Sequence, residues 1–255
     1  MQHGEILNLS SITGPFFIEV FSGSGRLAAA IRINGHTAFE FDINKKGGKK
    51  NLLDKKTLHE LLALIKHPNC QGVWFGFPCG TFSSARRHDG GPPPLRGTNP
   101  KDIWGLPTLE GKEKARVESA NKLLLRTHLI MRECERAAVP FCLGNPQRSK
   151  LWMHLLVLKW MRHKHTTKVE FDYCQFGTTW RKPTSVLAFN NIRFNQSVGR
   201  RCGGNPERDA NRATTCSRTE VAHEELTGFI GGKSSGQYKT NKACPYPQEF
   251  CEHVA

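Results

Sequence analysis

The sequence predicts one α/β domain built on a doubly wound, mostly parallel sheet with helices on both faces, followed by a small irregular C-terminal extension. Short apolar runs alternate with stretches of helical periodicity from residue 16 to residue 190, which is the pattern of repeated strand–helix–strand units. The chain has 255 residues, and an α/β fold of that length is commonly a single domain. We therefore place the main domain at residues 1–195 and a basic extension rich in cysteine and glycine at residues 196–255.

The first half of the sheet is predicted from apolar runs and from the glycine and proline residues that end them. Residues 16–21 form an apolar run that enters a glycine-containing turn, as a buried strand does. A helix follows and ends at Gly35, and a second strand covers residues 38–41. Residues 58–65 have apolar side chains at helical spacing, and Pro68 ends that helix.

The second half continues the alternation with a buried strand, a long loop rich in glycine, proline and arginine, the longest helix, a short strand, another helix and two last strands. In chain order these elements cover residues 73–77, 81–110, 111–138, 141–143, 151–161, 168–172 and 185–190. A loop as long as residues 81–110 is uncommon in a compact domain unless it serves a function. We therefore expect this loop to border a functional site.

The composition favours an intracellular protein with a polyanionic partner. Lys and Arg number 37 against 22 Asp and Glu, for a net charge of +15, and such an excess favours nucleic acid. No apolar stretch approaches the ~18 residues that a membrane span needs, and the first residues lack the pattern of a secretory signal. The nine cysteines are then expected as reduced thiols. We expect a monomer in a reducing compartment, with nucleic acid and no membrane as partner.

A glycine loop, Gly23-Ser24-Gly25, lies directly between the first strand and the first helix. Glycines let the backbone approach a bound nucleotide, and an acid at the next strand end, here Asp42, holds ribose hydroxyls. The pattern fits a dinucleotide such as NAD and adenosyl-methionine equally well. Both cofactors stay open at this point.

Cys79 is the candidate nucleophile. It follows the strand at residues 73–77, and the carboxyl end of a parallel strand opens into the ligand crevice. Nearby positive charge lowers the pKa of a thiol, and three arginines could supply it: Arg86, Arg87 and Arg181. Three other cysteines are expected to be buried and structural: Cys70, Cys134 and Cys142.

The order of these segments over residues 16–190 resembles that of the DNA cytosine carbon-5 methyltransferases. Phe21-Ser22-Gly23-Ser24-Gly25 matches the family's FxGxG cofactor loop, and Asp42 matches its ribose-binding acid. Residues 76–83 look like the GxPCQxFS nucleophile motif, with Gly80 in place of glutamine. Residues 176–184 occupy the place of the QxRxR motif, where only the basic character survives, as in shorter phage and retroelement relatives. Residues 245–247 are weakly similar to the closing motif that returns to the cofactor pocket.

The resemblance implies a Rossmann-like class I methyltransferase fold and methyl transfer from adenosyl-methionine to carbon 5 of cytosine, in DNA first and RNA as the alternative. The implied catalytic residues are Cys79, Ser83, Arg181 and Lys182. The implied cofactor-binding residues are Phe21, Ser22, Gly23, Ser24, Gly25, Asp42, Pro78 and Asn145.

One departure concerns the family's ENV or ENP tripeptide, which reads Gly144-Asn145-Pro146 in this chain. In the family mechanism the missing glutamate engages ring nitrogen 3 and the exocyclic amine of the base, and general acid help of this kind contributes about 10²–10⁴ in rate. Glu170 and Asp172 are the candidates to replace it. The alternatives are a catalytically degraded nucleic-acid-binding module and, on the glycine loop alone, an NAD-binding oxidoreductase.

Basic loop residues are expected to contact phosphates with salt-dependent affinity that is indifferent to sequence. They are Arg86, Arg87, Arg96, Arg148 and Lys150. A flipped base must be stacked and enclosed, and we expect Trp104 in the long loop to do this. Sequence specificity is expected to be short or relaxed, read by residues 196–236 and the same loop.

A metal site is predicted in the extension. Cys202, Cys216 and His223 have zinc-type ligand chemistry, with Cys174 or Cys244 as a fourth ligand. The spacing is irregular and contains no CxxC pair. A region with few apolar residues needs another source of stability, so we expect a structural zinc ion, with disorder as the alternative.

Overall fold

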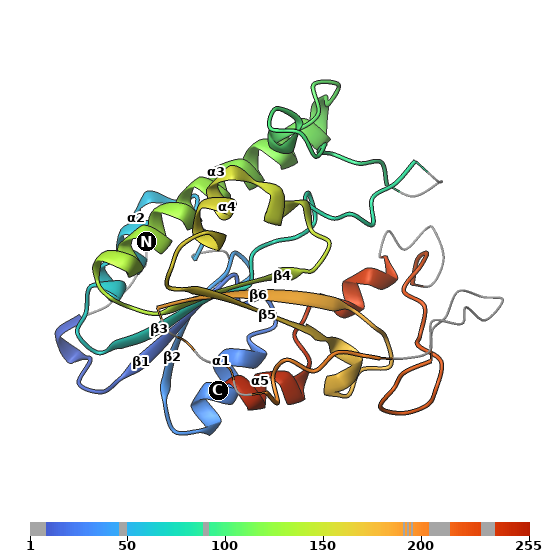
Figure 1. Ribbon diagram of the computed structural model, residues 1–255. Helices are drawn as coiled ribbons and strands as arrows, with labels where there is room; N and C mark the ends of the chain where they lie inside the picture. Colours follow the sequence, from blue (N-terminus) through green and yellow to red (C-terminus); the bar gives the residue numbers. More distant parts are fainter. Residues whose placement is uncertain are drawn as a thin grey trace.

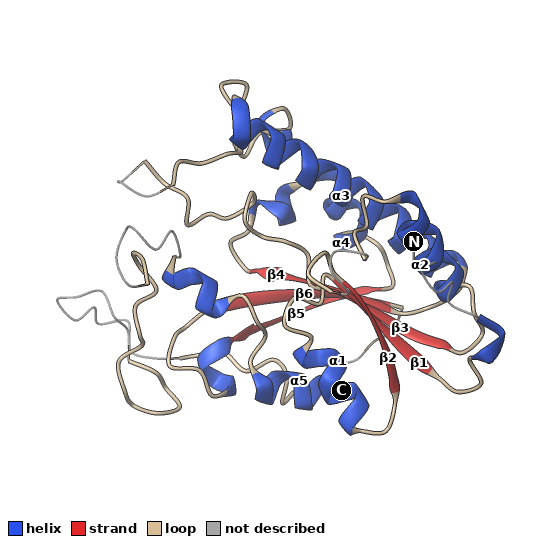
Figure 2. Cartoon of the chain, turned by 180° about the vertical axis from the view of Figure 1, so that it is seen from behind, coloured by secondary structure: helices blue, strands red, loops and turns tan. Residues whose placement is uncertain are grey.

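The computed structural model describes residues 9–45, 50–88, 92–190, 192, 194, 196–203, 215–230 and 238–255. Helices cover both faces of a six-stranded sheet (Figure 1). One face carries α2 (Lys55–Ile65), α3 (Gly111–Arg136) and α4 (Leu155–Met161). The other face carries α1 (Arg26–Ile33) and α5 (Gln248–Val254), as Figure 2 shows from behind.

The strand order in the sheet is β2-β1-β3-β4-β6-β5. In chain order the strands are β1 (Phe16–Val20), β2 (Thr37–Phe41), β3 (Cys70–Phe75), β4 (Phe141–Pro146), β5 (Thr166–Asp172) and β6 (Pro183–Phe189). β1 pairs in parallel with β2 and β3, and β3 pairs in parallel with β4. β6 runs antiparallel to both of its neighbours, β4 and β5. The predicted doubly wound, mostly parallel sheet with helices on both faces is confirmed.

This order positions a ligand crevice. The chain leaves β1 toward β2 on one side and then returns to β3 on the other. Open α/β sheets bind ligands beyond the carboxyl ends of their strands at such a reversal. The segments that follow β1 and β3, the glycine loop and the turn with Cys79, therefore face one another.

Several elements differ from their predicted bounds for local reasons. The helix expected at residues 151–161 is split into the 3₁₀ turn η4 (Lys150–Met153) and α4, because His154 is extended (ψ 132°) and its Nδ1 accepts the Leu156 N–H. The long loop holds a 3₁₀ turn, η3 (Asp102–Trp104). β4 continues to Pro146, so Gly144 and Asn145 belong to the strand itself.

The core has one apolar cluster on each face of the sheet. Phe16, Phe75 and Phe141 lie in the cluster beneath α2, α3 and α4. Trp74 and Phe250 lie in the opposite cluster, where the Phe250 ring stacks on Phe171 with a centroid distance of 4.1 Å. Since Phe250 belongs to α5, the extension contributes to the core of the sheet.

The cysteines expected to be structural are buried. No disulfide joins any of the nine cysteines, all of which lie in the described part of the chain, and Cys70, Cys134 and Cys142 are each buried. Burial raises the pKa of the Cys70 thiol to about 12. Over the described part of the chain, no helix is both long enough and apolar enough to cross a membrane.

Candidate active site

A pocket of about 1270 Å³ opens at the carboxyl ends of β1, β3 and β4. Its walls come from the glycine loop after β1, the Cys79 turn after β3 and the end of β4. Residues 226–229 and 238–246 of the extension form the opposite wall. Segments far apart in the sequence thus surround one space.

The glycine loop turns tightly from β1 into α1. Gly25 caps α1 with φ 70°, and a Cβ at this position would lie 2.3 Å from Glu40 Oε1. Phe21 has φ 58°, a strained conformation that tends to persist at functional sites. The Ser22 hydroxyl oxygen is buried without a hydrogen-bond partner among the described residues, and Phe21, Ser22, Gly23 and Ser24 all line the pocket.

Asp42 lies beside this loop and lines the pocket, with 9% of its surface exposed. Its Oδ2 accepts the Gly23 N–H at 2.9 Å, and its Oδ1 accepts the Asn44 N–H at 2.9 Å. A carboxylate has about four acceptor sites, so further sites on Asp42 can accept ligand hydroxyls. Asp42 both holds the loop and faces the ligand space.

Glu19 is a pocket residue that the sequence analysis missed. It lies within β1, is 3% exposed, lines the pocket and accepts the Ala28 N–H in the first turn of α1 at 2.9 Å. Burial raises the pKa of this carboxyl to about 7. A single acid inside an otherwise apolar strand was the signal that could have revealed it.

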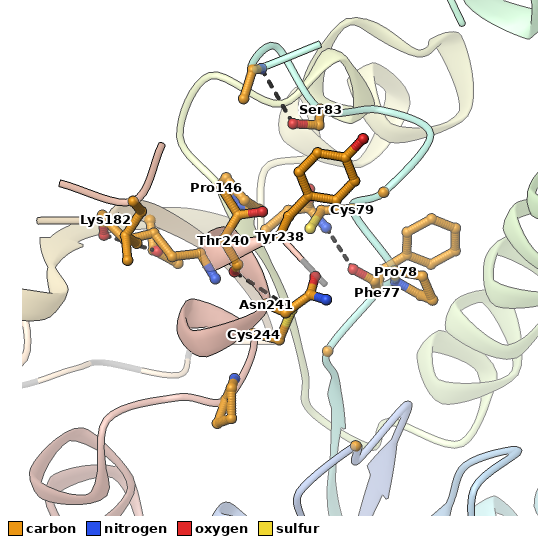
Figure 3. A pocket seen from close by; sticks show the side chains of 18 of the residues that line it. Phe77, Pro78, Cys79, Ser83, Pro146, Lys182, Tyr238, Thr240, Asn241 and Cys244 are labelled. Atoms are coloured by element: carbon orange, nitrogen blue, oxygen red, sulfur yellow. Dashed lines mark hydrogen bonds between the residues drawn. The ribbon is translucent and has the colours of Figure 1, made fainter. Parts of the chain in front are cut away.

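Cys79 lies half-buried in the turn after β3 and lines the pocket (Figure 3). Asn145 is 3% exposed and its Nδ2 donates to the Phe77 carbonyl at 2.7 Å. This bond ties the end of β4 to the Cys79 turn. Pro78 and Ser83 also line the pocket, and the Ser83 hydroxyl accepts the Ala85 N–H at 3.2 Å.

Lys182 lines the same pocket as Cys79. Its Nζ donates to the Ala243 carbonyl at 2.5 Å and to the Tyr173 hydroxyl at 3.4 Å. Burial lowers the pKa of the Lys182 ammonium, and negative charge on Cys79 acts in the opposite direction. Figure 3 shows both side chains in the same pocket. Negative charge on Cys79 therefore favours the protonated form of Lys182.

The space of the missing glutamate is filled by Tyr246. A Cβ at Gly144 would lie 1.9 Å from the Tyr246 hydroxyl oxygen and 3.1 Å from its Cζ. The Tyr246 ring packs edge-on against Trp74 at 5.6 Å, and Arg26 donates to the Tyr246 carbonyl at 3.0 Å. Burial raises the pKa of Tyr246 well above its usual value, so the hydroxyl remains a donor. The tail thus reaches the pocket, where Pro245 and Tyr246 line it.

Three acid and base assignments need correction. Arg181 is not among the described residues that line the pocket; its Nε pairs with Asp172 at 3.4 Å. Asp172 is fully buried and also pairs with Arg201 at 3.2 Å. Glu170 pairs with Lys168 and Arg201 at 2.7 and 2.9 Å. Neither acid is in the described lining of the pocket, so neither replaces the missing glutamate.

Arg96 is wrongly assigned to phosphate binding. It is 1% exposed, and its Nη1 donates to the Ile103 carbonyl and to Asn121 Oδ1, both at 2.8 Å. Its guanidinium lies 3.8 Å from the centre of the Phe82 ring, and burial lowers its pKa to about 10. Arg96 therefore fixes the long loop from inside the protein, and only tertiary packing reveals this.

The other basic residues separate into two groups. Arg86 and Arg87 line the pocket, and Arg86 pairs with Glu113 at 3.1 Å. Arg148 is exposed and Lys150 is half-buried, and the pocket lining that the structure describes includes neither. The Lys150 ammonium donates to the Arg96 carbonyl. Lys150 thus also supports the loop.

The aromatic residues of the pocket differ from the expectation. Trp104 packs edge-on against His154 at 4.4 Å and is absent from the described pocket lining. Phe229 and Tyr238 of the extension stack at 4.5 Å, and both line the pocket. No local sequence pattern marked this pair, because its two rings meet only through the fold of the extension.

The predicted metal ligands come together away from the pocket. Cys202, Cys216 and His223 form a buried group with Cys174. Cys244, the other suggested fourth ligand, is exposed and lines the pocket instead. Of the two options for the fourth position, the structure selects Cys174.

Comparison with known proteins adds two distant solved structures. No protein-family model matches the chain, and no curated protein matches it. The methyltransferase EhMeth of Entamoeba histolytica matches with 14% identity and a TM-score of 0.42, over 72% of this chain and 56% of that protein. A mutant DNMT2 of Spodoptera frugiperda matches with 16% identity and a TM-score of 0.39, over 71% of this chain and 52% of that protein. The match thus spans little more than half the length of these two proteins.

Proposed function

We propose that this chain is an adenosyl-methionine-dependent methyltransferase that acts on carbon 5 of cytosine in nucleic acid, with Cys79 as the nucleophile. One observation carries the proposal: a single pocket joins the glycine loop and Asp42 to the Cys79 turn. A methyl donor on the loop side and a base on the cysteine side would meet in that space.

The residues on the loop side fit adenosyl-methionine. When bound, this cofactor supplies an electrophilic methyl group on a cationic sulfonium. The unpartnered Ser22 hydroxyl and the Asp42 carboxylate suit the ribose hydroxyls. Glu19, with its pKa near 7, suits the cationic part of the ligand, because a nearby cation favours the ionised carboxyl.

The same residues disfavour NAD. A dinucleotide places its pyrophosphate on the N-terminus of the first helix. Here Glu19 already accepts the Ala28 N–H in the first turn of α1. A pyrophosphate at that position would meet a second negative charge, so the oxidoreductase alternative is the weaker one.

The cysteine side suits covalent catalysis. Addition of the Cys79 thiolate to carbon 6 of the base makes carbon 5 nucleophilic, and loss of the carbon 5 proton after methylation lets the thiolate leave. The Lys182 ammonium lines the same pocket. Asn145 holds the turn through the Phe77 carbonyl.

Tyr246 takes the part of the missing glutamate in this proposal. Its hydroxyl occupies the space where a side chain at residue 144 would begin and is protonated, so it can donate a hydrogen bond to the base ring. Tyrosine is a weaker acid than glutamic acid. We therefore expect slower turnover than a glutamate would support.

The charge and the aromatic residues of the outer wall favour a nucleic acid substrate. The net charge is +15, and Arg86, Arg87 and Arg116 line the pocket. Phe229 and Tyr238 offer ring faces on which an extruded base can stack. DNA is the first substrate to test and RNA the second.

Gly144 favours a second candidate, a methyltransferase-like module that binds nucleic acid without modifying it. In that case the Tyr246 hydroxyl simply fills the space that the lost side chain left. The two candidates differ in one observable, the appearance of methylated cytosine.

The test is transfer of labelled methyl groups from adenosyl-methionine to mixed DNA and RNA by the purified full chain. We expect label in the parent, a loss in Cys79→Ser on the order of 1000-fold or more, and a loss in Tyr246→Phe of about 100-fold. Cys244→Ser, which removes another thiol of the pocket, is the matched control and is expected to retain most of the label. Calorimetric binding of adenosyl-homocysteine checks that each variant is folded.

Equal label in Cys79→Ser and parent would overturn the nucleophile assignment. Binding of adenosyl-homocysteine and nucleic acid without any transfer by the parent would favour the binding module. Binding of NAD in place of adenosyl-homocysteine would overturn the cofactor assignment.

A further inference from the structure

Four buried metal-ligand side chains meet where the extension joins the sheet. Cys174 lies in the 3₁₀ turn η5 (Tyr173–Phe176) directly after β5, whereas Cys202, Cys216 and His223 belong to the extension. Their ligand atoms all lie within 4.8 Å of one another. Tetrahedral coordination at the usual zinc–sulfur distance places sulfur atoms about 3.8 Å apart, and Cys202 Sγ already lies 3.8 Å from His223 Nε2. We propose that these four residues bind one zinc ion that fixes the extension to the sheet.

The donor set is that of a structural zinc site. Three thiolates and one imidazole form a Cys₃His group, which selects zinc among the common divalent ions. The nearest buried carboxylate, Asp172, is engaged by Arg181, by Arg201 and by the Cys202 N–H. It is therefore occupied elsewhere and leaves the four soft ligands to complete the site.

Ordinary packing does not account for the cluster. Its three cysteines form an apolar cluster of their own, separate from the two cores of the sheet. Three small thiols bury little apolar area, so this contact alone would hold the segments around Cys202, Cys216 and His223 weakly, although α5 of the same extension packs into the core. No disulfide joins these three cysteines either.

Hydrogen-bond donors already point at the sulfur atoms. The Ser217 N–H donates to Cys202 Sγ at 3.4 Å. Gln175 Nε2 lies 3.7 Å from both Cys174 Sγ and Cys216 Sγ. Donors of this kind orient thiolate ligands and stabilise their charge around a metal.

A small hairpin sets the spacing of two ligands. The Cys216 N–H donates to the Val221 carbonyl at 2.9 Å, and an antiparallel bridge joins Thr215 to Ala222. Glu220 takes φ 57° in the turn. Cys216 and His223 therefore lie at the open end of one hairpin, side by side.

The site is structural and supports the wall of the pocket. Four protein ligands leave no open position for a substrate, and none of the four is among the described residues that line the pocket. After His223, the Glu224 carboxylate bonds Thr179 Oγ1 and the Lys242 ammonium. The chain then forms the outer wall through residues 226–229 and 238–246. Zinc binding would thus hold the segment that carries Tyr238 and Tyr246.

The direct test is the metal content of the full chain, purified without chelators and measured by mass spectrometry. We expect one zinc per chain and a lower melting temperature after chelation. Cys216→Ser and His223→Ala are expected to lose the zinc. Cys142→Ala and Cys244→Ser, which change one buried and one exposed cysteine outside the cluster, are the matched controls and should retain it.

Cobalt substitution gives an independent readout of the ligand set. Cobalt in a tetrahedral thiolate site is expected to give intense visible absorption and a thiolate charge-transfer band, both weakened in Cys216→Ser. If Cys216→Ser fails to fold, the zinc stoichiometry and the cobalt spectrum of the parent test the proposal. Cys216→His, which restores a metal ligand, should then bind metal.

Two results would overturn the proposal. One is a folded parent that takes up no zinc and melts at the same temperature with and without chelator. The other is full zinc content in both Cys216→Ser and His223→Ala. Neither result depends on methyl transfer, so the zinc site and the proposed function can fail separately.

Discussion

The two ends of the pocket are built differently. At the β1 end, Asp42 accepts N–H groups from Gly23 and Asn44, so neighbouring stretches of chain hold the loop in place. At the β4 end, the space beside Gly144 is filled by Tyr246 from the tail. The β1 end, where we propose that the cofactor binds, is thus set by local structure, and the β4 end, where we propose that the base binds, is set by long-range packing. These are called the cofactor end and the base end below. Local motifs predict the first kind of site well and the second kind poorly.

The two ends also differ in charge. Glu19 and Asp42 lie near the glycine loop together with Arg26, whereas Lys182, Arg86 and Arg87 lie on the Cys79 side together with Glu113, which pairs with Arg86. Basic residues outnumber acidic ones on the Cys79 side, which would favour a polyanionic substrate there.

Among the substitutions considered, removal of Arg96 beneath the long loop should cost the most stability. Arg96→Ala leaves the Ile103 carbonyl and Asn121 without their donor and opens a cavity beneath the loop. We expect the free energy of unfolding to fall by about 3–5 kcal/mol, measured by urea denaturation. Arg148→Ala, at an exposed position, should change it by less than about 0.5 kcal/mol. Equal stability of the two variants would contradict the buried role of Arg96.

The cofactor end should gain stability and lose affinity when Glu19 is neutralised. Because the pKa of Glu19 is raised to about 7, its contribution to stability is present below the pKa of an unfolded glutamate and is lost as pH rises through 7. Glu19→Gln should therefore raise the free energy of unfolding at pH 8, by up to about 3 kcal/mol, and change it little at pH 4.5. Its affinity for adenosyl-methionine should fall at pH 8.

Glu40→Gln is the matched control for Glu19→Gln. Although burial alone would raise the pKa of Glu40, its pairing with Lys45 and Arg32 leaves that pKa lowered. Its replacement should therefore reduce stability at pH 8. If both variants changed the free energy of unfolding at pH 8 in the same direction, the opposite pKa shifts of Glu19 and Glu40 would be contradicted.

Any side chain at residue 144 should lower the stability of the protein while Tyr246 is present. Gly144→Ala places its Cβ on the Tyr246 hydroxyl, and we expect a cost of about 1–3 kcal/mol in thermal or urea unfolding. Tyr246→Phe in the same chain should recover most of it, because the next atom is 3.1 Å away. Gly72→Ala, whose Cβ would meet its nearest atom at 3.5 Å, should cost less. Full additivity of the Gly144 and Tyr246 changes would contradict the contact.

The smallest effects are expected from the exposed arginines. Arg87→Ala and Arg148→Ala should each reduce the slope of log affinity against log salt by about 0.9 if each contacts one DNA phosphate. Fluorescence anisotropy with a short duplex at several salt concentrations measures this slope. An unchanged slope in both variants would move the binding face away from these residues.

The sequence predicted the alternation of elements, the glycine loop with Asp42 and the position of Cys79, because each depends on residues close together in the chain. It did not predict the burial of Arg96, since nothing in a Gly- and Pro-rich loop tells an inward guanidinium from an outward one. It also named Asp172 as a candidate to replace the glutamate, because the ion pairs of Asp172 with Arg181 and Arg201 form only in the folded protein. The position of Tyr246 beside Gly144 depends on the path of the C-terminal segment in the folded protein, which the sequence does not show.

The most direct test of the account is covalent capture of a nucleic acid that carries 5-fluorocytosine. Fluorine at carbon 5 cannot leave as the proton does, so a cysteine bonded to carbon 6 stays attached after methyl transfer. The account predicts a protein–nucleic acid band on a denaturing gel that requires adenosyl-methionine, is absent with Cys79→Ser and is present with Cys244→Ser. Methylation of cytosine carbon 5 by the parent without such a band, or an equal band with Cys79→Ser, would contradict it.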